Sequence, residues 1–223
     1  MIIPAILASS KQEFRHLLDA SKSFTDFVQI DFVDPQFASN KTVMPRECFY
    51  EDFGHLNFEA HIMAHKDQAM PLIDSLKSFS QCTRIIIHRE AAETLEDLRQ
   101  LLNRIRNIGK ETGVAINPET DIREVGKVIK KVDLVLFMGV TPGHYGSAFH
   151  PQVLDKIQDF QKRYTMYQGL TSLDGGVTKD RLADIQATKV DMAAAGSAIF
   201  GESDPEQSYQ ELSKQWQKYE QIR

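Results

Sequence analysis

Short apolar runs alternate with longer amphipathic stretches from one end of this 223-residue chain to the other. The apolar runs are continuous rather than interrupted by polar residues, which is typical of strands in a parallel sheet buried on both faces. Eight strand–helix units in this length favour a (β/α)8 TIM barrel over an open doubly wound sheet. No Gly-x-Gly-x-x-Gly follows the first strand, as it often does in a dinucleotide-binding sheet. We therefore expect one α/β barrel domain over residues 1–223.

The expected elements follow from this alternation. Strands are expected at Ile2–Leu7, Asp26–Phe32, Asn57–Met63, Thr83–His88, Gly113–Ile116, Val132–Met138, Gly169–Leu173 and Val190–Ala195. Helices are expected at Gln12–Ser23, Gln68–Ser78, Ala92–Ile108, Ile122–Lys131, Pro151–Arg163, Lys179–Gln186 and Glu206–Gln221. The last helix carries four apolar or aromatic residues near helical spacing, so we expect it to pack on the barrel wall. These residues are Tyr209, Leu212, Trp216 and Tyr219.

Charge and cysteine content restrict the partners of the chain. The net charge is −5, and the basic residues are outnumbered and scattered, so nucleic acid is not an expected partner. Cys48 and Cys82 lack metal-ligand spacing and indicate a reducing compartment. No basic leader precedes the first apolar run, and no apolar stretch reaches the roughly 18 residues of a membrane span. We expect a cytoplasmic protein that does not bind a membrane.

In a barrel of this kind the active site lies at the carboxyl ends of the strands. The residues read there are Ala5, Leu7, Gln29, Asp31, His61, Met63, His88, Asn117, Met138, Asp174, Gly196 and Ser197. Residues 29 and 31 share one face of their strand because side chains alternate with a period of two. Asp31, His61 and Asp174 could together bind a divalent metal through mixed nitrogen and oxygen ligands. Alternatively, the two aspartates could serve as an acid/base pair.

Each of these residues also has a purely structural interpretation. Asp31 could be a helix N-cap or an ion-pair partner, and His61 a hydrogen-bonded residue of the core or rim. His88 has no motif partner, which favours a structural role. Met63 and Met138 could fill the barrel or line a site that accepts a shifting ligand. The joint placement of the residues, rather than any single one, indicates a site.

The run Leu173-Asp174-Gly175-Gly176-Val177 ends one expected strand with a carboxylate and two glycines, and Gly196-Ser197 ends the next. Glycines let backbone N–H groups approach an anion closely, and paired loops of this kind form the phosphate site of (β/α)8 barrels. Asp174 would then lie as a base beside a bound phosphosugar. The run could also be a strand followed by a simple Gly-Gly turn.

Taken together, these residues resemble the ribulose-phosphate 3-epimerase family over nearly the whole chain, as a divergent member would. The order and spacing of so many landmarks argue against a chance match. The landmarks are Pro4-Ala5-Ile6-Leu7, Ile30-Asp31-Phe32-Val33-Asp34, Glu59-Ala60-His61-Ile62-Met63, His88-Arg89-Glu90-Ala91, Ile116-Asn117-Pro118-Glu119-Thr120, Met138-Gly139-Val140-Thr141-Pro142-Gly143, Leu173-Asp174-Gly175-Gly176-Val177 and Gly196-Ser197-Ala198-Ile199-Phe200.

The resemblance implies a TIM barrel of the ribulose-phosphate binding type that interconverts D-ribulose 5-phosphate and D-xylulose 5-phosphate. In the family, two aspartates on opposite faces of the sugar act as general acid and base, and these map to Asp31 and Asp174. A divalent metal, bound by two histidines and the same aspartates, stabilises the cis-enediolate, and one histidine maps to His61. The resemblance therefore implies a zinc, iron or manganese ion held by Asp31, His61 and Asp174.

The resemblance also implies where the substrate binds. Its phosphate would lie among the backbone amides of Gly175, Gly176, Gly196 and Ser197, under the loop Pro142–Gly146. The remaining substrate-binding residues would be His61, Met63, Met138, Gly143 and Gly146. The expected partner is thus a small ketose phosphate. Family members associate through the barrel flanks, so a homo-oligomer is expected as well.

Departures from the family pattern cluster in the site. The second metal-binding histidine of the family is Gln29 here, which offers only a neutral amide oxygen, a poor replacement for imidazole with zinc or ferrous iron. The serine after the first proline is Ala5. The mobile loop, Pro142–Ser147, carries bulkier residues than the family normally has. His144 or His65 could supply a nitrogen, although nothing in the sequence positions either one.

Three outcomes therefore stay open: an epimerase with altered metal preference, a 3-epimerase of a related ketose phosphate, or a phosphosugar-binding relative with little or no activity. Related barrels that decarboxylate orotidine monophosphate or synthesise hexulose phosphate carry Asp-x-Lys at the third strand, where this chain has Glu59-Ala60-His61. A Schiff-base aldolase would need a lysine at a strand end. Because both acid/base carboxylates are retained, we favour an enzyme over a binding protein.

Overall fold

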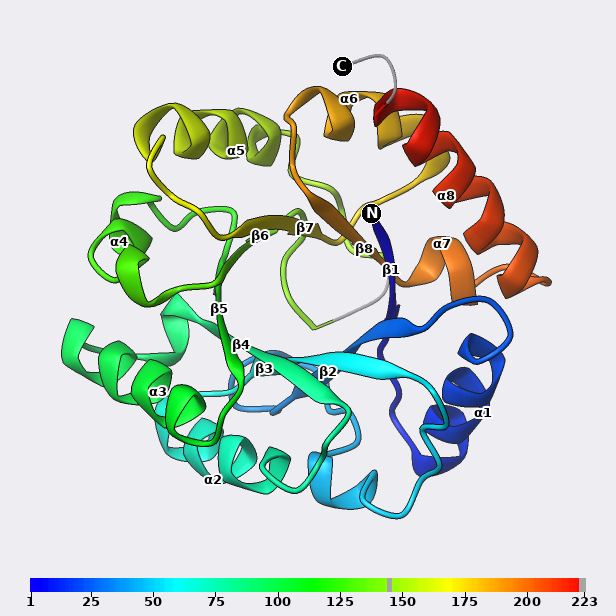
Figure 1. Ribbon diagram of the computed structural model, residues 1–223, viewed down its shortest axis with the longest axis horizontal. Coiled ribbons are helices and arrows are strands. Elements are labelled where there is room, and N and C mark those ends of the chain that lie inside the picture. Colours follow the sequence, from blue (N-terminus) through cyan, green and yellow to red (C-terminus); the bar gives the residue numbers. More distant parts are fainter. Residues whose placement is uncertain (144–145, 221–223) are drawn as a thin grey trace.

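The computed structural model describes residues 1–143 and 146–220. Within them, eight parallel strands close into a barrel in the order β1-β2-β3-β4-β5-β6-β7-β8. Each strand pairs with its neighbours in the sequence, and β1 pairs with β8 to close the ring. Figure 1 shows the strands around the centre and the helices outside them. The expected (β/α)8 TIM barrel is confirmed.

The strands lie close to their expected positions. Their bounds are β1 Ile2–Ile6, β2 Phe27–Val33, β3 Asn57–Met63, β4 Cys82–His88, β5 Glu111–Ile116, β6 Leu134–Met138, β7 Leu170–Asp174 and β8 Met192–Ala195. The α-helices are α1 Lys11–Ser21, α2 Lys66–Leu76, α3 Leu95–Asn107, α4 Arg123–Gly126, α5 Gln152–Arg163, α6 Leu182–Ala187, α7 Ser197–Phe200 and α8 Pro205–Glu220. Short 3-10 helices are η1 Pro45–Glu47, η2 Arg89–Ala91, η3 Ile129–Lys131 and η4 Lys179–Arg181.

The alternation of side chains along each strand divides the core into two parts. On β2, Val28, Ile30 and Phe32 pack with the residues of the surrounding helices in the outer core. The intervening residues of β2 point into the barrel, since successive side chains face opposite sides of a strand. A separate apolar cluster of inward residues fills the barrel, namely Ile3, Ile86, Ala115, Leu134, Leu136, Met138, Val140 and Met192. Polar residues on inward positions of the strands are therefore held inside a packed barrel rather than on its surface.

Local capping determines where two of the long helices begin. At α1, the Ser10 hydroxyl accepts a hydrogen bond from the Glu13 amide, which satisfies one of the free N–H groups of the first turn. At α3, Thr94 and Asp97 form a reciprocal capping box. Both caps fix the point at which the chain leaves the loop and enters the helix that covers the barrel.

One expected helix, Ile122–Lys131, is wrong as a continuous element. The structure has a single helical turn, α4, followed by the separate 3-10 helix η3. Gly126 ends α4, and the hydroxyl of Tyr164 occupies the space that a side chain at this position would need. Glycine lowers helix stability by about 1 kcal/mol relative to alanine, which favours the break at this position.

Other differences concern element ends. The expected helix Lys179–Gln186 begins as the 3-10 helix η4 before continuing as α6, and the short helix α7 was not expected. The last helix is present as α8, although the side chain of Tyr219 and all of Gln221 lie outside the described residues. None of the helices described here combines the length and apolar character that crossing a bilayer requires.

Candidate active site

Three strands bring the predicted acid/base and metal residues together. Asp31 and His61 are paired in register on the neighbouring strands β2 and β3, and Asp174 ends β7. In the barrel order, β1 and β8 separate β7 from β2, so the two carboxylates reach each other across the mouth. The ligand atoms of all three side chains lie within 4.8 Å of one another. The three residues therefore form a possible metal-binding cluster, as the sequence predicted.

Hydrogen bonds join this cluster to Gln29. The Nδ1 atom of His61 lies 3.1 Å from Asp31 Oδ1 and 3.2 Å from Asp174 Oδ2. The amide nitrogen of Gln29 donates to the same two oxygens, at 2.8 Å each. All four side chains are buried. The carboxylates are thus held by an imidazole and an amide in a space from which bulk water is largely excluded.

The charges in the cluster change its proton affinities. Although burial favours the neutral imidazole, hydrogen bonds to Asp174 and Asp31, together with their negative charges, raise the pKa of His61 to about 10. Burial raises the pKa of Asp31, partly opposed by its hydrogen bond to His61. His61 is therefore a cation at neutral pH in this arrangement, and a metal ion would have to displace its Nδ1 proton.

A chain of hydrogen bonds behind the cluster fixes the orientation of His61. Its Nε2 atom lies 2.9 Å from Nε2 of His88, and the Nδ1 atom of His88 lies 3.3 Å from Glu90. Glu90 also accepts hydrogen bonds from the Asn117 backbone amide, at 3.0 Å, and from the Thr120 hydroxyl. Burial opposes ionisation of Glu90, but its hydrogen bonds, first that from His88, lower its pKa to about 2.

The ionised Glu90 determines which ring nitrogens carry protons. It accepts the Nδ1–H of His88, so that Nε2 of His88 accepts from Nε2–H of His61. Burial, followed by the charge of His61, lowers the pKa of His88 despite Glu90, which keeps this second ring neutral. As a result, Nδ1 of His61 faces the two aspartates. Sequence reasoning found no partner for His88; the Glu90 two residues later was the available signal.

A cavity of about 280 Å³ opens beside Asp174. Drug-sized ligand sites begin near 300 Å³, so its size suits a small metabolite. Six further predicted substrate-binding residues line it, namely Met138, Gly146, Gly175, Gly176, Gly196 and Ser197. Ala5, which replaces the serine of the family, lines it too. Asp174 therefore shares one cavity with the predicted phosphate-binding residues, whereas Asp31 and His61 contact Asp174 or its neighbours without lining that cavity.

The two glycines after Asp174 adopt backbone conformations that other residues rarely adopt. Gly175 and Gly176 have φ angles of 92° and 71°. A side-chain carbon would collide with Val140 at the first and with Phe149 at the second. These contacts explain why the turn needs glycine at both positions, and both glycines line the cavity.

Sequence reasoning missed Arg181, which is the single cationic residue among the described residues that line this cavity. Its guanidinium donates to the Gly176 carbonyl oxygen at 3.1 Å and lies over the ring of Phe149, 5.0 Å from its centroid. The arginine lies at the end of η4, inside a stretch predicted only as helix. Its place seven residues after Asp174, just past the Gly-Gly turn, was the available signal.

Three predicted substrate-binding residues are not among the residues that line the cavity: His61, which lies in the acid/base cluster, Met63 and Gly143. Met63 packs with Leu7 and Val33 in a small apolar cluster. The carbonyl oxygen of Gly143 accepts a hydrogen bond from the Asn40 side chain at 2.7 Å. Their roles in binding stay predictions.

Neither of the alternative nitrogen ligands joins the metal-binding cluster among the described residues. The His65 ring contacts Phe37, 5.2 Å between ring centroids. His144 lies outside the described residues. His61 is therefore the one imidazole that the described structure places against both carboxylates.

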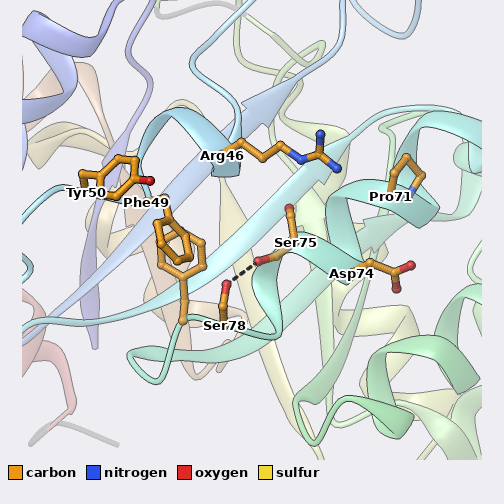
Figure 2. Close-up of a pocket in the computed structure, with 8 residues that line it drawn as sticks. Arg46, Phe49, Tyr50, Pro71, Asp74, Ser75 and Ser78 are labelled. Carbon is orange, nitrogen blue, oxygen red and sulfur yellow. Dashed lines mark hydrogen bonds between the residues drawn. The ribbon is translucent and has the colours of Figure 1, made fainter.

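A second pocket, of about 420 Å³, lies on the flank of the barrel between the η1 segment and α2. Figure 2 shows the aromatic rings of Phe49 and Tyr50 on one side and the polar residues of α2 on the other. Asp74, one of the polar residues, is already paired with Arg104 at 2.5 Å. None of the residues that line this flank pocket is a predicted site residue, so the pocket is separate from the acid/base cluster.

Fold and site together define a (β/α)8-barrel enzyme whose polar cluster lies at the carboxyl ends of the strands. The chain belongs to the ribulose-phosphate 3-epimerase family, whose sequence profile matches residues 1–200. The family resemblance read from the sequence is thereby confirmed. Named members of this family are isomerases that act on carbohydrates.

Named relatives cover nearly the whole chain. The ribulose-phosphate 3-epimerase of Escherichia coli is 31% identical over 212 residues, which span 92% of this chain and 90% of that protein. The ribulose-phosphate 3-epimerase of Bacillus subtilis is 30% identical over 220 residues, which span 95% of this chain and 97% of that protein. Among solved structures, KGPDC from Streptococcus mutans has a TM-score of 0.72 over 98% of this chain and 97% of that one. At 13% identity, the likeness to KGPDC shows the fold alone.

Proposed function

We propose that this protein interconverts D-ribulose 5-phosphate and D-xylulose 5-phosphate by proton transfer at C3. The observation that carries the proposal is the convergence of Asp31 and Asp174 from separate sides of the barrel onto one amide nitrogen, 2.8 Å from each. Family membership and the names of the relatives support the same reaction. Epimerisation requires removing a proton from one face of a carbon and returning one to the other, which two opposed carboxyl groups can do.

The two aspartates supply the general base and the general acid. One aspartate, as carboxylate, accepts the C3 proton, and the other, as carboxylic acid, donates a proton to the opposite face. The two exchange roles in the reverse direction. Burial raises the pKa of Asp31, which makes its carboxylate a stronger base and its acid form easier to maintain near neutral pH.

The donor set of the cluster fits a divalent cation. Asp31, His61 and Asp174 offer two carboxylates and one imidazole within 4.8 Å, and such mixed ligands suit zinc, ferrous iron or manganese. The hydrogen bond from His61 to His88 leaves Nδ1 of His61 directed at the carboxylates, as a metal ligand requires. A cation bound there would supply positive charge where negative charge develops on the ketose oxygens.

The phosphate group is proposed to bind at the other end of the cavity. Gly175, Gly176, Gly196 and Ser197 provide backbone N–H groups there, and Arg181 provides a positive charge. Met138, paired in register with Asp174, lines the same cavity. Anchoring the phosphate would fix C3 between the two aspartates, which reduces the entropic cost of reaching the transition state.

The test is isotope exchange into the sugar. The protein is incubated with D-ribulose 5-phosphate in deuterated buffer, with and without added zinc, manganese or ferrous ion, and deuterium at C3 is measured by mass spectrometry and NMR of the recovered sugars. We expect conversion to D-xylulose 5-phosphate with one deuterium at C3. Asp31→Asn and Asp174→Asn should each slow exchange by about 10²–10⁴-fold, the contribution typical of a general acid or base.

An exposed carboxylate gives the matched control. Asp159→Asn on α5 should exchange like the wild type, and circular dichroism should show the barrel intact in all variants. Wild-type exchange in either site variant would refute the two-carboxylate mechanism. Parallel incubation with a ketohexose phosphate separates the related-ketose alternative, and binding without exchange would identify a phosphosugar-binding relative.

A further inference from the structure

The side-chain amide of Gln29 lies at the centre of the acid/base cluster. Its nitrogen is 2.8 Å from Asp31 Oδ1, 2.8 Å from Asp174 Oδ2 and 3.4 Å from Nδ1 of His61. The residue is completely buried on β2. An atom in contact with all three groups stands where a cation bound by them would have to stand, and its two N–H groups satisfy the two carboxylates instead.

The other end of the same amide is unsatisfied. The Oε1 atom of Gln29 is buried and has no hydrogen-bond partner among the described residues. Leaving a buried polar atom unpaired costs about 1–3 kcal/mol. The last side-chain bond of glutamine has a broad, two-fold rotational preference, so a half-turn would exchange the positions of oxygen and nitrogen.

The two orientations of this amide suit opposite states of the site. With no cation present, a half-turn would place an amide oxygen against two carboxylate oxygens, which repel it. With a cation present, the same half-turn would remove two N–H donors that repel the ion and replace them with an oxygen ligand. The arrangement of charges around Gln29 therefore couples the orientation of its amide to occupancy of the cluster.

We propose that Gln29 has two alternating roles. In the cation-free protein its amide nitrogen donates hydrogen bonds to the two aspartates, and when a divalent cation binds, its amide oxygen becomes the fourth ligand. The proposal rests on the metal site of the proposed function and specifies which ions it selects. Three oxygen ligands and one nitrogen form a harder set than two oxygens and two imidazoles, which favours manganese relative to zinc.

The first test measures metal binding without any sugar. Affinities for Mn²⁺ and Zn²⁺ are determined by competition with a chromophoric chelator for the wild type, Gln29→Leu and Gln29→His. Loss of the oxygen ligand in Gln29→Leu should weaken Mn²⁺ binding by at least about tenfold, the effect of 1.4 kcal/mol. Gln29→His should raise the ratio of zinc affinity to manganese affinity by a similar factor. The exposed Gln210→Leu on α8 serves as the control and should bind both ions as the wild type does.

The second test follows the amide directly. In the ¹⁵N-labelled protein, the side-chain NH₂ resonances of Gln29 are identified by their loss in Gln29→Leu or Gln29→His. In the cation-free protein their hydrogens should be protected from exchange with solvent, because both are bonded to buried carboxylates. Addition of Zn²⁺, which is diamagnetic, should shift both resonances as the nitrogen leaves the carboxylates. This readout holds even if one variant folds poorly.

Three results would overturn the inference. These are wild-type Mn²⁺ affinity in Gln29→Leu, Gln29 resonances unchanged by an ion that binds, and failure of the wild type to bind either ion. The proposed reaction is judged separately. A protein that exchanges no deuterium at C3 but binds metal through Gln29 refutes the epimerase proposal alone, and an active protein indifferent to Gln29→Leu refutes this one alone.

Discussion

Arg181 reaches the same cavity as Asp174, the proposed acid/base residue, from η4, and it supplies the positive charge that the glycine loops lack. A hydrogen bond to a charged group contributes about 1.5–3 kcal/mol. We therefore expect Arg181→Gln to raise KM for the sugar phosphate by about 10–100-fold. kcat should change much less, since a phosphate held by Arg181 would be bound equally in the ground state and the transition state. Steady-state kinetics at several salt concentrations measure both.

Two further variants separate this role from a structural one. Arg181→Lys keeps the charge and should recover part of the affinity, although lysine cannot reproduce the planar fork of arginine. Arg99→Gln on the outside of α3 removes a partly exposed arginine and should leave KM unchanged. Equal loss of kcat and of affinity in Arg181→Gln, with no recovery in Arg181→Lys, would show that Arg181 serves only to hold the Gly176 turn.

The pKa of His61 predicts how stability depends on pH. Its folded-state pKa is about 10, above the ordinary value of 6.5, because Asp174 and Asp31 outweigh the cost of burial. A raised pKa contributes stability that is fully present below pH 6.5 and is lost as pH rises toward 10. We expect the free energy of unfolding of the chelator-treated protein to fall across this range. Urea titrations at intervals from pH 6.5 to 10 measure it.

His61→Asn provides the comparison, since its amide can still donate to the aspartates but does not titrate in this range. Cys48 and Cys82 have pKa values raised to about 12 by burial, and they lower stability at the alkaline end in both proteins. The difference between the two curves therefore isolates His61. If the curves are parallel from pH 6.5 to 10, the imidazole is neutral in the fold and the hydrogen-bond pattern described above is wrong.

At the level of single residues, the sequence could predict which carboxylates meet but not how they are held. The period of two along a parallel strand places Asp31 and His61 on the inner face, and the Gly-Gly turn marks Asp174. The orientation of the Gln29 amide depends on two carboxylates and an imidazole from other strands, which no local pattern encodes. Arg181 was missed for a similar reason, because its contacts with the Gly176 carbonyl oxygen and the Phe149 ring form only in the folded chain.

At the level of elements, strands were easier to place than the helices between them. Each strand is a continuous apolar run because both of its faces are buried, and that pattern survives in the sequence whatever the strand contacts. Short helices depend on tertiary contacts as much as on their own residues. Gly126, packed under the Tyr164 hydroxyl, divides one expected helix into α4 and η3.

At the level of the whole molecule, closure of the barrel follows from the number of strand–helix units, which explains why the fold class could be predicted before any contact was known. The last helix has a particular place in that closure. α8 contacts β1, α1, α6 and α7, so it joins the first strand and first helix of the chain to the last two helices that precede it. Figure 1 shows α8 on the outside of the ring, beside α1 and α7.

Trp216, the single tryptophan of the chain, lies on α8 and is 1% exposed. Because Trp216 belongs to the outer core that surrounds the whole barrel, Trp216→Ala should lower the free energy of unfolding by about 3–5 kcal/mol. Urea unfolding followed by circular dichroism measures this loss. Trp216→Phe should cost less because it keeps most of the buried ring, and Tyr50→Ala, at a residue 92% exposed, should stay within about 0.5 kcal/mol. Since α8 contacts both the start of the chain, at β1 and α1, and the helices α6 and α7 near its end, the wild type should lose its native tryptophan fluorescence and its ellipticity in one transition. Two separate transitions would mean that α8 detaches while the barrel remains closed without it.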